Sequence, residues 1–240
     1  MANLLGQLHL LKDPTKALHY LRRAADQADI DVPQPAYVFG MLYLGEFDQV
    51  DLPLPLILST LPQPTPSDPD PRSSEARRRI EKSAYLGFAP AQYKLGWAYE
   101  YAKMGCPFDP LLSVQYYSLA SQQGETEADM ALSKWFLCGS PGSFEKDEVL
   151  AVTFAEKAAK RGLASAEFAM GYYCEVGIGG PIELEAARKW YQRVSRSTSP
   201  RCKANIYHRP YRMVVQMPYS ACKRYHKPSQ RPSREPNMTN

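Results

Sequence analysis

The chain has 240 residues, of which 44% are hydrophobic and 22% are charged, and its formal net charge is +4. This length and apolar content suffice for one domain with a substantial core. No apolar run approaches the roughly 20 residues that a membrane-spanning helix needs. The opening MANLLGQLHLLKD also lacks the basic start and the cleavage site of a signal peptide. We therefore expect a cytoplasmic protein and exclude a membrane-spanning one.

The first three predicted helices lie before residue 51, and a proline-rich insert follows them. The helical segments are NLLGQLHLL around Gly6, KALHYLRRAADQ at 16–27 and PAYVFGMLYL around Gly40. Residues 51–72 contain seven prolines, which predict an extended linker because proline forbids helix interiors. A P-x-x-P motif from Pro66 to Pro69 could bind an SH3 or WW domain, but its acidic neighbours and the lack of a preceding arginine favour a plain linker.

Three later segments share one pattern. AQYKLGWAYE, ADMALSKWFL and AEFAMGYYCE align from Ala91, Ala128 and Ala166, and each has a small residue at its sixth place. With the two earlier copies, the small residues are Gly6, Gly40, Gly96, Ser133 and Gly171, at intervals of 34, 56, 37 and 38. The insert accounts for the long interval. Self-similarity at such a period predicts an all-α solenoid of helical repeats.

A second helical pattern alternates with the first. It occurs at 16–27, 75–87, 113–124, 151–162 and 185–194. Three of these segments stop at Gly87, Gly124 and Gly162, which we interpret as helix C-terminal caps. Each repeat is therefore a helix, a short loop and a second helix.

The glycines inside the first helices need a reason, because glycine costs about 1 kcal/mol relative to alanine in a helix. Gly96 lies beside the face that Ala91 and Leu95 form, so its small size would let the partner helix approach closely. Gly171 as a phosphate-loop residue is disfavoured because it lies inside a helix. On this basis we expect burial of Ala91, Leu95, Gly96, Tyr99, Ala166, Met170 and Gly171.

The repeat pattern resembles a known family. A-x-x-x-L-G-x-x-Y, a short loop with Gly and Asp, and A-x-x-W-Y/F-x-x-A-A-x-x-G are similar to the Sel-1-like repeat, a relative of the tetratricopeptide repeat, over about residues 2–195. The stretch from Glu127 to Val194 resembles the repeats of fungal chitin synthase regulators and of related protein kinase C activators in the cell-wall pathway. The resemblance implies a scaffold that binds a chitin synthase subunit or a cell-wall signalling protein.

In related helical repeats, the first helix of every pair lines the concave surface. The residue after each small position should then point away from the packed face. This places Met41, Trp97, Lys134 and Tyr172 in one stripe, to which Tyr101 adds an aromatic ring one turn beyond Trp97. Exposed aromatics beside a lysine are typical of interface hot spots. The alternative is that Trp97 and Tyr172 fill gaps between adjacent repeats.

No residue cluster indicates an enzyme, a metal or a cofactor. The four histidines are distant in sequence from clustered acids or nucleophiles. Cys202, His208, Cys222 and His226 are chemically suited to zinc, but their spacing matches no standard finger. The five cysteines are odd in number and contain no C-x-x-C pair, which favours reduced thiols. We therefore expect a non-enzymatic protein without a metal.

The residues after 195 differ in charge from the repeats. Residues 196–240 hold ten Lys/Arg against one acid, whereas residues 1–195 hold 19 against 24. Six prolines and one-sided charge predict a disordered tail that binds anionic partners, with a membrane surface favoured over nucleic acid. The predicted organisation is thus a solenoid of about five repeats at 2–195 with an insert at 51–72, followed by a tail at 196–240. Recruitment to the cell periphery would come through a partner.

Overall fold

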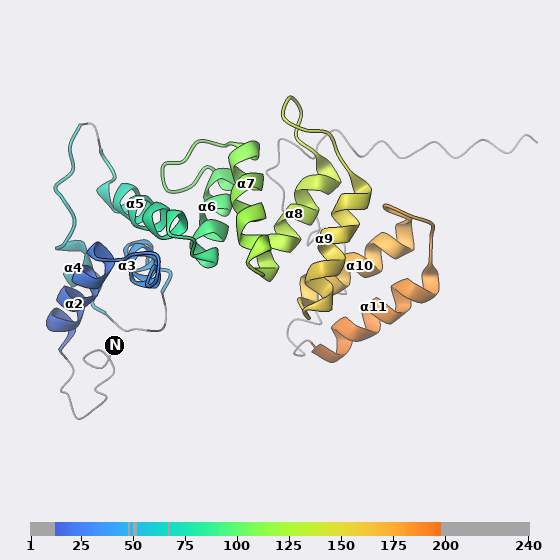
Figure 1. Ribbon diagram of the computed structural model, residues 1–240, viewed down its shortest axis with the longest axis horizontal. Helices are drawn as coiled ribbons and strands as arrows, with labels where there is room; N and C mark the ends of the chain where they lie inside the picture. The colour runs from blue at the N-terminus through green and yellow to red at the C-terminus, as the bar shows by residue number, and fades with distance from the viewer. Residues whose placement is uncertain (1–12, 48, 50–51, 67, 198–240) are drawn as a thin grey trace, which may run out of the picture.

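The computed structural model describes residues 13–47, 49, 52–66 and 68–197, and these residues form helices without strands (Figure 1). The helices stack side by side into an elongated row that runs from α2 to α11. Their bounds are α2 Pro14–Asp26, α3 Gln34–Leu44, α4 Leu54–Leu58, α5 Pro71–Tyr85, α6 Ala89–Tyr101, α7 Pro110–Gln122, α8 Thr126–Cys138, α9 Glu148–Lys160, α10 Ala164–Val176 and α11 Leu184–Ser197. The prediction of an all-α solenoid is confirmed.

The helices pack in pairs, each of which contacts the next. α3 packs on α5, α6 on α7, α8 on α9 and α10 on α11, and the second helix of each pair packs on the first helix of the next. We call α3, α6, α8 and α10 the A helices, and α2, α5, α7, α9 and α11 the B helices. Gly6 and the helix expected around it lie outside the described residues.

Aspartate side chains begin four of the B helices. Each carboxylate accepts a hydrogen bond from the backbone N–H three residues later, which satisfies one of the donors that a helix leaves free at its start. The four aspartates are Asp13, Asp70, Asp109 and Asp147. The A helices begin without such a side-chain cap.

The turns that follow α5, α7 and α9 are tight because a glycine follows each of these helices in the left-handed conformation. The φ angles are +90° at Gly87, +93° at Gly124 and +86° at Gly162. At the first of these turns, the N–H groups of Gly87 and Phe88 donate to the carbonyls of Ala84 and Ser83. This is the Schellman arrangement, which satisfies the last carbonyls of the helix.

The loops from A to B helices are fastened at one place in each of the three pairs from α6 to α11. The N–H of the residue that precedes the B helix donates to a carbonyl in the last turns of the A helix. The three bonds run from Asp109 to Tyr99 at 3.2 Å, from Asp147 to Phe136 at 2.7 Å and from Glu183 to Cys174 at 2.9 Å. We call this bond the loop clamp.

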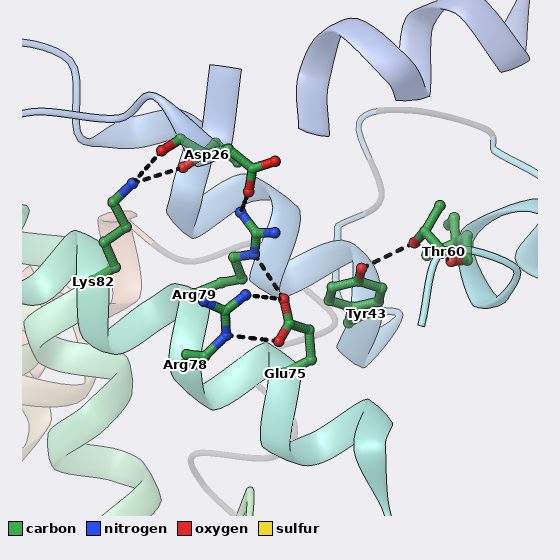
Figure 2. A network of polar contacts seen from close by, with 9 residues as sticks. Asp26, Tyr43, Thr60, Glu75, Arg78, Arg79 and Lys82 are labelled. Atoms are coloured by element: carbon green, nitrogen blue, oxygen red, sulfur yellow. Dashed lines mark hydrogen bonds and ion pairs between the residues drawn. The ribbon is translucent and has the colours of Figure 1, made fainter. Parts of the chain in front are cut away.

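The insert corrects the expectation of a wholly extended linker. It contains the short helix α4, which starts with proline in its first turn, where proline is tolerated. Ile57 on α4 is buried in the same hydrophobic cluster as Leu18 of α2 and Leu42 of α3. The hydroxyl groups of Tyr43 and Thr60 share a hydrogen bond of 2.9 Å, seen in Figure 2. The insert is therefore packed against the first helices.

Most of the residues that the sequence places in the core are buried, with one exception. Ala91, Leu95, Ala166 and Met170 are at most 5% exposed. Tyr99 is only half-buried, because it packs at the edge of the cluster around Leu95, where its ring stacks on Tyr116 of α7 at a centroid distance of 5.8 Å.

Candidate protein-interaction surface

The interior glycines of the A helices lie against tyrosines of the B helices. A Cβ at Gly96 would be 2.7 Å from the ring of Tyr117 on α7, and a Cβ at Gly171 would be 2.5 Å from the ring of Tyr191 on α11. Real Cβ atoms do not come this close to other atoms, so an alanine at either place would force the helices apart. The glycines therefore set the distance between the two helices of a pair.

The same tyrosines bond to a glutamate four residues after each glycine. The hydroxyl of Tyr117 donates to Glu100 at 2.6 Å, and that of Tyr191 donates to Glu175 at 2.7 Å. We call this arrangement the Gly-Tyr-Glu unit. In two of the pairs, α6 with α7 and α10 with α11, this unit joins the A helix to the B helix by both packing and a charge-assisted hydrogen bond.

The repeat of α8 and α9 replaces all three members together. Ser133 stands in the place of the glycine, Ala155 in that of the tyrosine and Leu137 in that of the glutamate. The smaller alanine leaves room for the serine side chain, whose hydroxyl lies 3.1 Å from that of Tyr173 on α10. The three positions thus change together, and the hydrogen bond from the B-helix tyrosine to the glutamate is absent from this repeat.

Burial shapes the chemistry of Glu100. Its side chain is 5% exposed, and desolvation raises the pKa of its carboxyl above the ordinary value, although the Tyr117 hydroxyl and the charge of Lys134 act in the other direction. Burial likewise raises the pKa of Tyr117. Lys134, one of the five stripe residues, therefore lies within electrostatic reach of α6.

The stripe expected on the A helices includes one residue that the structure buries. Met41 is 8% exposed and packs in a hydrophobic cluster with Ile80 of α5 and Leu95 of α6. A Cβ at the neighbouring Gly40 would be 2.8 Å from Ile80, so α5 sits directly on this part of α3. The expectation that Met41 points away from the packed face is corrected.

The four other stripe residues are half-buried. Trp97 packs against two hydrophobic clusters, one around Leu95 and one around Leu132, so it bridges adjacent repeats. Its ring lies 5.7 Å from that of Tyr101 and carries the ammonium of Lys94 at 3.9 Å from its centroid. The ammonium of Lys94 also forms an ion pair with the carboxylate of Glu46, just after the end of α3, at an N–O distance of 2.5 Å.

Tyr172 on α10 resembles Trp97 in its surroundings. It packs beside the cluster of Met130 and Met170, and its ring centroid is 6.4 Å from that of Tyr173. Trp97 and Tyr172 therefore both seal contacts between repeats and keep part of their surface open. We call Lys94, Trp97, Tyr101, Lys134 and Tyr172 the A-helix face.

Sequence reasoning missed a set of ion pairs around buried acidic side chains of the A helices. Asp129 of α8 is fully buried, and it accepts hydrogen bonds from Ser121 of α7 and from Lys157 and Arg161 of α9. The sequence indicates these pairs only by a polar residue directly after the first alanine of the three aligned A-helix segments. These residues are Gln92, Asp129 and Glu167, all at most 5% exposed.

A related network joins α5 to α2, as Figure 2 shows. The guanidinium of Arg79, which is 4% exposed, binds the carboxylates of both Asp26 and Glu75. Lys82 donates to the backbone carbonyls of Ala25 and Asp26, at the end of α2. Cations are favourable at helix C-termini, where unpaired carbonyls carry partial negative charge.

The described residues show neither a metal-binding cluster nor a membrane helix. They contain no group of three His, Cys, Asp or Glu that could hold a metal ion. The zinc alternative at Cys202, His208, Cys222 and His226 lies outside the described residues. No helix in the described ranges is long and apolar enough to cross a membrane.

Comparison with known proteins finds fungal regulators. The chain is 34% identical over 85% of its length to chitin synthase regulator SKT5 of Malassezia restricta, and 38% identical over 75% to chitin synthase regulatory factor 4 of Schizosaccharomyces pombe. It is 34% identical over 39% of its length to activator of C kinase protein 1 of Saccharomyces cerevisiae. It spans only 13%, 26% and 16% of the lengths of these three relatives.

A solved structure and a family model agree on the fold. The Sel1 repeat protein of Oxalobacter formigenes superposes with a TM-score of 0.64 at 21% identity, covering 93% of this chain and 81% of that one. The Sel1 repeat model matches residues 1–29, 89–125, 126–163 and 164–196, and so omits the pair that the insert interrupts. With more than half of its length matched, the chain belongs to the Sel1 repeat family.

Proposed function

We propose that this chain is a non-enzymatic adaptor that binds a chitin synthase subunit and localises or activates it in fungal cell-wall synthesis. The observation that carries this proposal is the similarity to chitin synthase regulators along 85% of the chain. The stacked repeats support it, because a solenoid of this kind presents an extended surface to a partner. Recruitment to the cell periphery follows from the location that such a partner would have.

The A-helix face is the proposed binding surface. Trp97, Tyr101 and Tyr172 offer partly exposed rings, and aromatic residues are enriched among the residues that dominate binding energy. Lys134 adds a partly exposed positive charge beside these rings, whereas Lys94 is buried and paired with Glu46. The face therefore fits a protein segment with apolar side chains and acidic neighbours.

A second candidate function is activation of a kinase in the cell-wall pathway. The observation that favours it is the similarity to activator of C kinase protein 1, which covers 39% of the chain. We rank kinase activation second because the chitin synthase regulators match a larger share of this chain, 85% and 75%. Contact of the basic tail with an anionic membrane remains compatible with both, and nucleic-acid binding is the least favoured partner class.

The test measures chitin synthase activity in cells that lack the gene, complemented by the wild-type chain or by variants. We expect Tyr101→Ser and Tyr172→Ser to reduce the rescue of activity and the capture of the synthase subunit. Tyr85→Ser is the matched control, because Tyr85 is 92% exposed and lies on a B helix. Circular dichroism of the purified variants separates lost binding from lost folding.

Two outcomes would contradict the proposal. Full chitin synthase activity without the gene, together with a defect in kinase signalling, would favour the second candidate. Unfolding of both tyrosine variants would show that these rings belong to the core and would remove the A-helix face as the binding surface. The adaptor function would then need another surface.

A further inference from the structure

A row of exposed apolar side chains lies where the A helices turn into the B helices. Five of the large apolar residues that the structure leaves open belong to these loops or to the first turn of the following helix. They are Phe108 at 47% exposed, Leu111 at 58%, Val149 at 66%, Ile182 at 63% and Leu184 at 64%. We call these five residues the loop edge.

The loops that carry the loop edge are connected through residues of α8 and α9. The ring of Phe108 lies 6.3 Å from that of Trp135, which lies 5.9 Å from Phe144 in the next loop. A Cβ at Gly179 would be 2.8 Å from the carbonyl of Glu148, so the last loop rests on the start of α9. The three A-to-B loops between α6 and α11 are therefore linked by contacts through α8 and α9 and form one border of the solenoid.

This border is acidic. The segments 103–112, 139–150 and 177–185 contain two lysines, Lys103 and Lys146. They contain six acids, which are Asp109, Glu145, Asp147, Glu148, Glu183 and Glu185. An exposed apolar row with surplus negative charge favours an occupant that is apolar and positively charged.

The chain itself contains a segment of that chemistry. Residues 206–225, IYHRPYRMVVQMPYSACKRY, combine aromatic and aliphatic side chains with four Lys/Arg residues, one histidine and no acid. A segment of this length is too short to form a core of its own, so its apolar side chains can be buried only against another surface. We propose that the loop edge binds residues 206–225 of the same chain.

The connection is long enough for this contact. α11 begins at the loop edge with Leu184 and has 14 residues, which corresponds to about 21 Å of helix. The nine residues from 198 to 206 span up to about 30 Å when extended. The segment can therefore return along α11 to the loop edge. This contact is separate from the A-helix face and would shield a border of the solenoid from other proteins.

The experiment uses the full chain, mixed in unlabelled and nitrogen-15-labelled form, and a carbodiimide that joins lysines to nearby carboxylates. We expect amide cross-links from Lys203 or Lys223 to Glu145, Glu183 or Glu185 within chains of one isotopic composition. The triple variant Leu111→Ser, Val149→Ser and Ile182→Ser should lose these cross-links. Tyr85→Ser should keep them.

A second pair of variants leaves the solenoid unchanged. Arg209→Glu with Arg212→Glu should lose the cross-links, whereas Arg231→Glu with Arg234→Glu, which changes the charge equally outside the segment, should keep them. Absence of cross-links in the wild-type chain, or equal yields in both pairs, would overturn the proposal. Cross-links between labelled and unlabelled chains would overturn it in favour of a contact between two copies.

Discussion

The ring of Tyr117 on α7 lies against Gly96 on α6 so closely that a Cβ on the glycine would be 2.7 Å from the ring. Gly96→Ala should therefore lower the free energy of unfolding by about 1–3 kcal/mol through overpacking, despite the better helix propensity of alanine. Urea denaturation measures the change. Gly180→Ala is the control, because nothing lies within 4 Å of its Cβ position, and it should leave stability nearly unchanged.

The repeat of α8 and α9 suggests which changes around position 96 would make room for a serine there. Gly96→Ser should be tolerated better when it is combined with Tyr117→Ala and Glu100→Leu, because this set copies Ser133, Ala155 and Leu137. We expect the triple variant to be more stable than the sum of its single changes predicts. Strict additivity would show that the three positions do not form a unit.

The pH dependence of stability should depend on Glu100. Because burial raises the pKa of its carboxyl above the ordinary value of 4.5, the folded chain holds this proton more tightly than the unfolded chain does. The free energy of unfolding therefore falls as the pH rises from 4.5 through the raised pKa. Glu100→Gln should remove this part of the slope in denaturation curves measured from pH 4 to 8.

The control for this experiment is Glu156→Gln, because Glu156 forms a surface pair with Lys160. Its slope should match that of the wild-type chain. A Glu100→Gln variant with an unchanged slope would show that the carboxyl is ionised in the folded state as easily as in the unfolded state.

Ala102 ends α6 in the left-handed conformation with φ at +50°, where Gly45 and Gly177 end α3 and α10. Residues with a Cβ pay about 1 kcal/mol or more for this conformation. Ala102→Gly should therefore raise the midpoint of thermal unfolding. Gly177→Ala, the reverse change, should lower it. An Ala102→Gly variant that melts earlier than the wild-type chain would contradict this argument.

Asp129→Ala should destabilise the fold. It leaves the buried Ser121 hydroxyl and the partly exposed ammonium of Lys157 without their shared carboxylate, and a buried polar group left without its partner costs about 1–3 kcal/mol. Chemical denaturation checks the value. A loss well below about 1 kcal/mol, the size expected for a surface pair, would show that the buried carboxylate contributes no more than an exposed one.

The helical pairs could be predicted from the sequence, because small residues and capping glycines recur at a period near that of one repeat. Side-chain exposure was harder to predict. Met41 was expected to point outward, but its pair partner α5 comes after the insert and covers it. Tyr99 was expected in the core, but it is half-buried and its ring stacks on that of Tyr116. Both errors concern contacts with residues distant in sequence, which periodicity does not specify.

The charged network was also beyond the reach of the sequence pattern. A single acidic residue such as Asp129 usually lies on a solvated helix face. Its burial depends on Lys157 and Arg161 at the end of α9, the helix that pairs with α8. Only the packed structure brings these three side chains together.

The loop clamp has a consequence for how this chain can vary. The bonds from Asp109, Asp147 and Glu183 fix where each B helix starts, although the number of residues between the two ends of the clamp differs among the three loops. The position of the helix is thus independent of the length of the loop before it. Residues can be inserted or removed at this border while the superhelix keeps its pitch, so the repeats can acquire new surface chemistry there without being refolded.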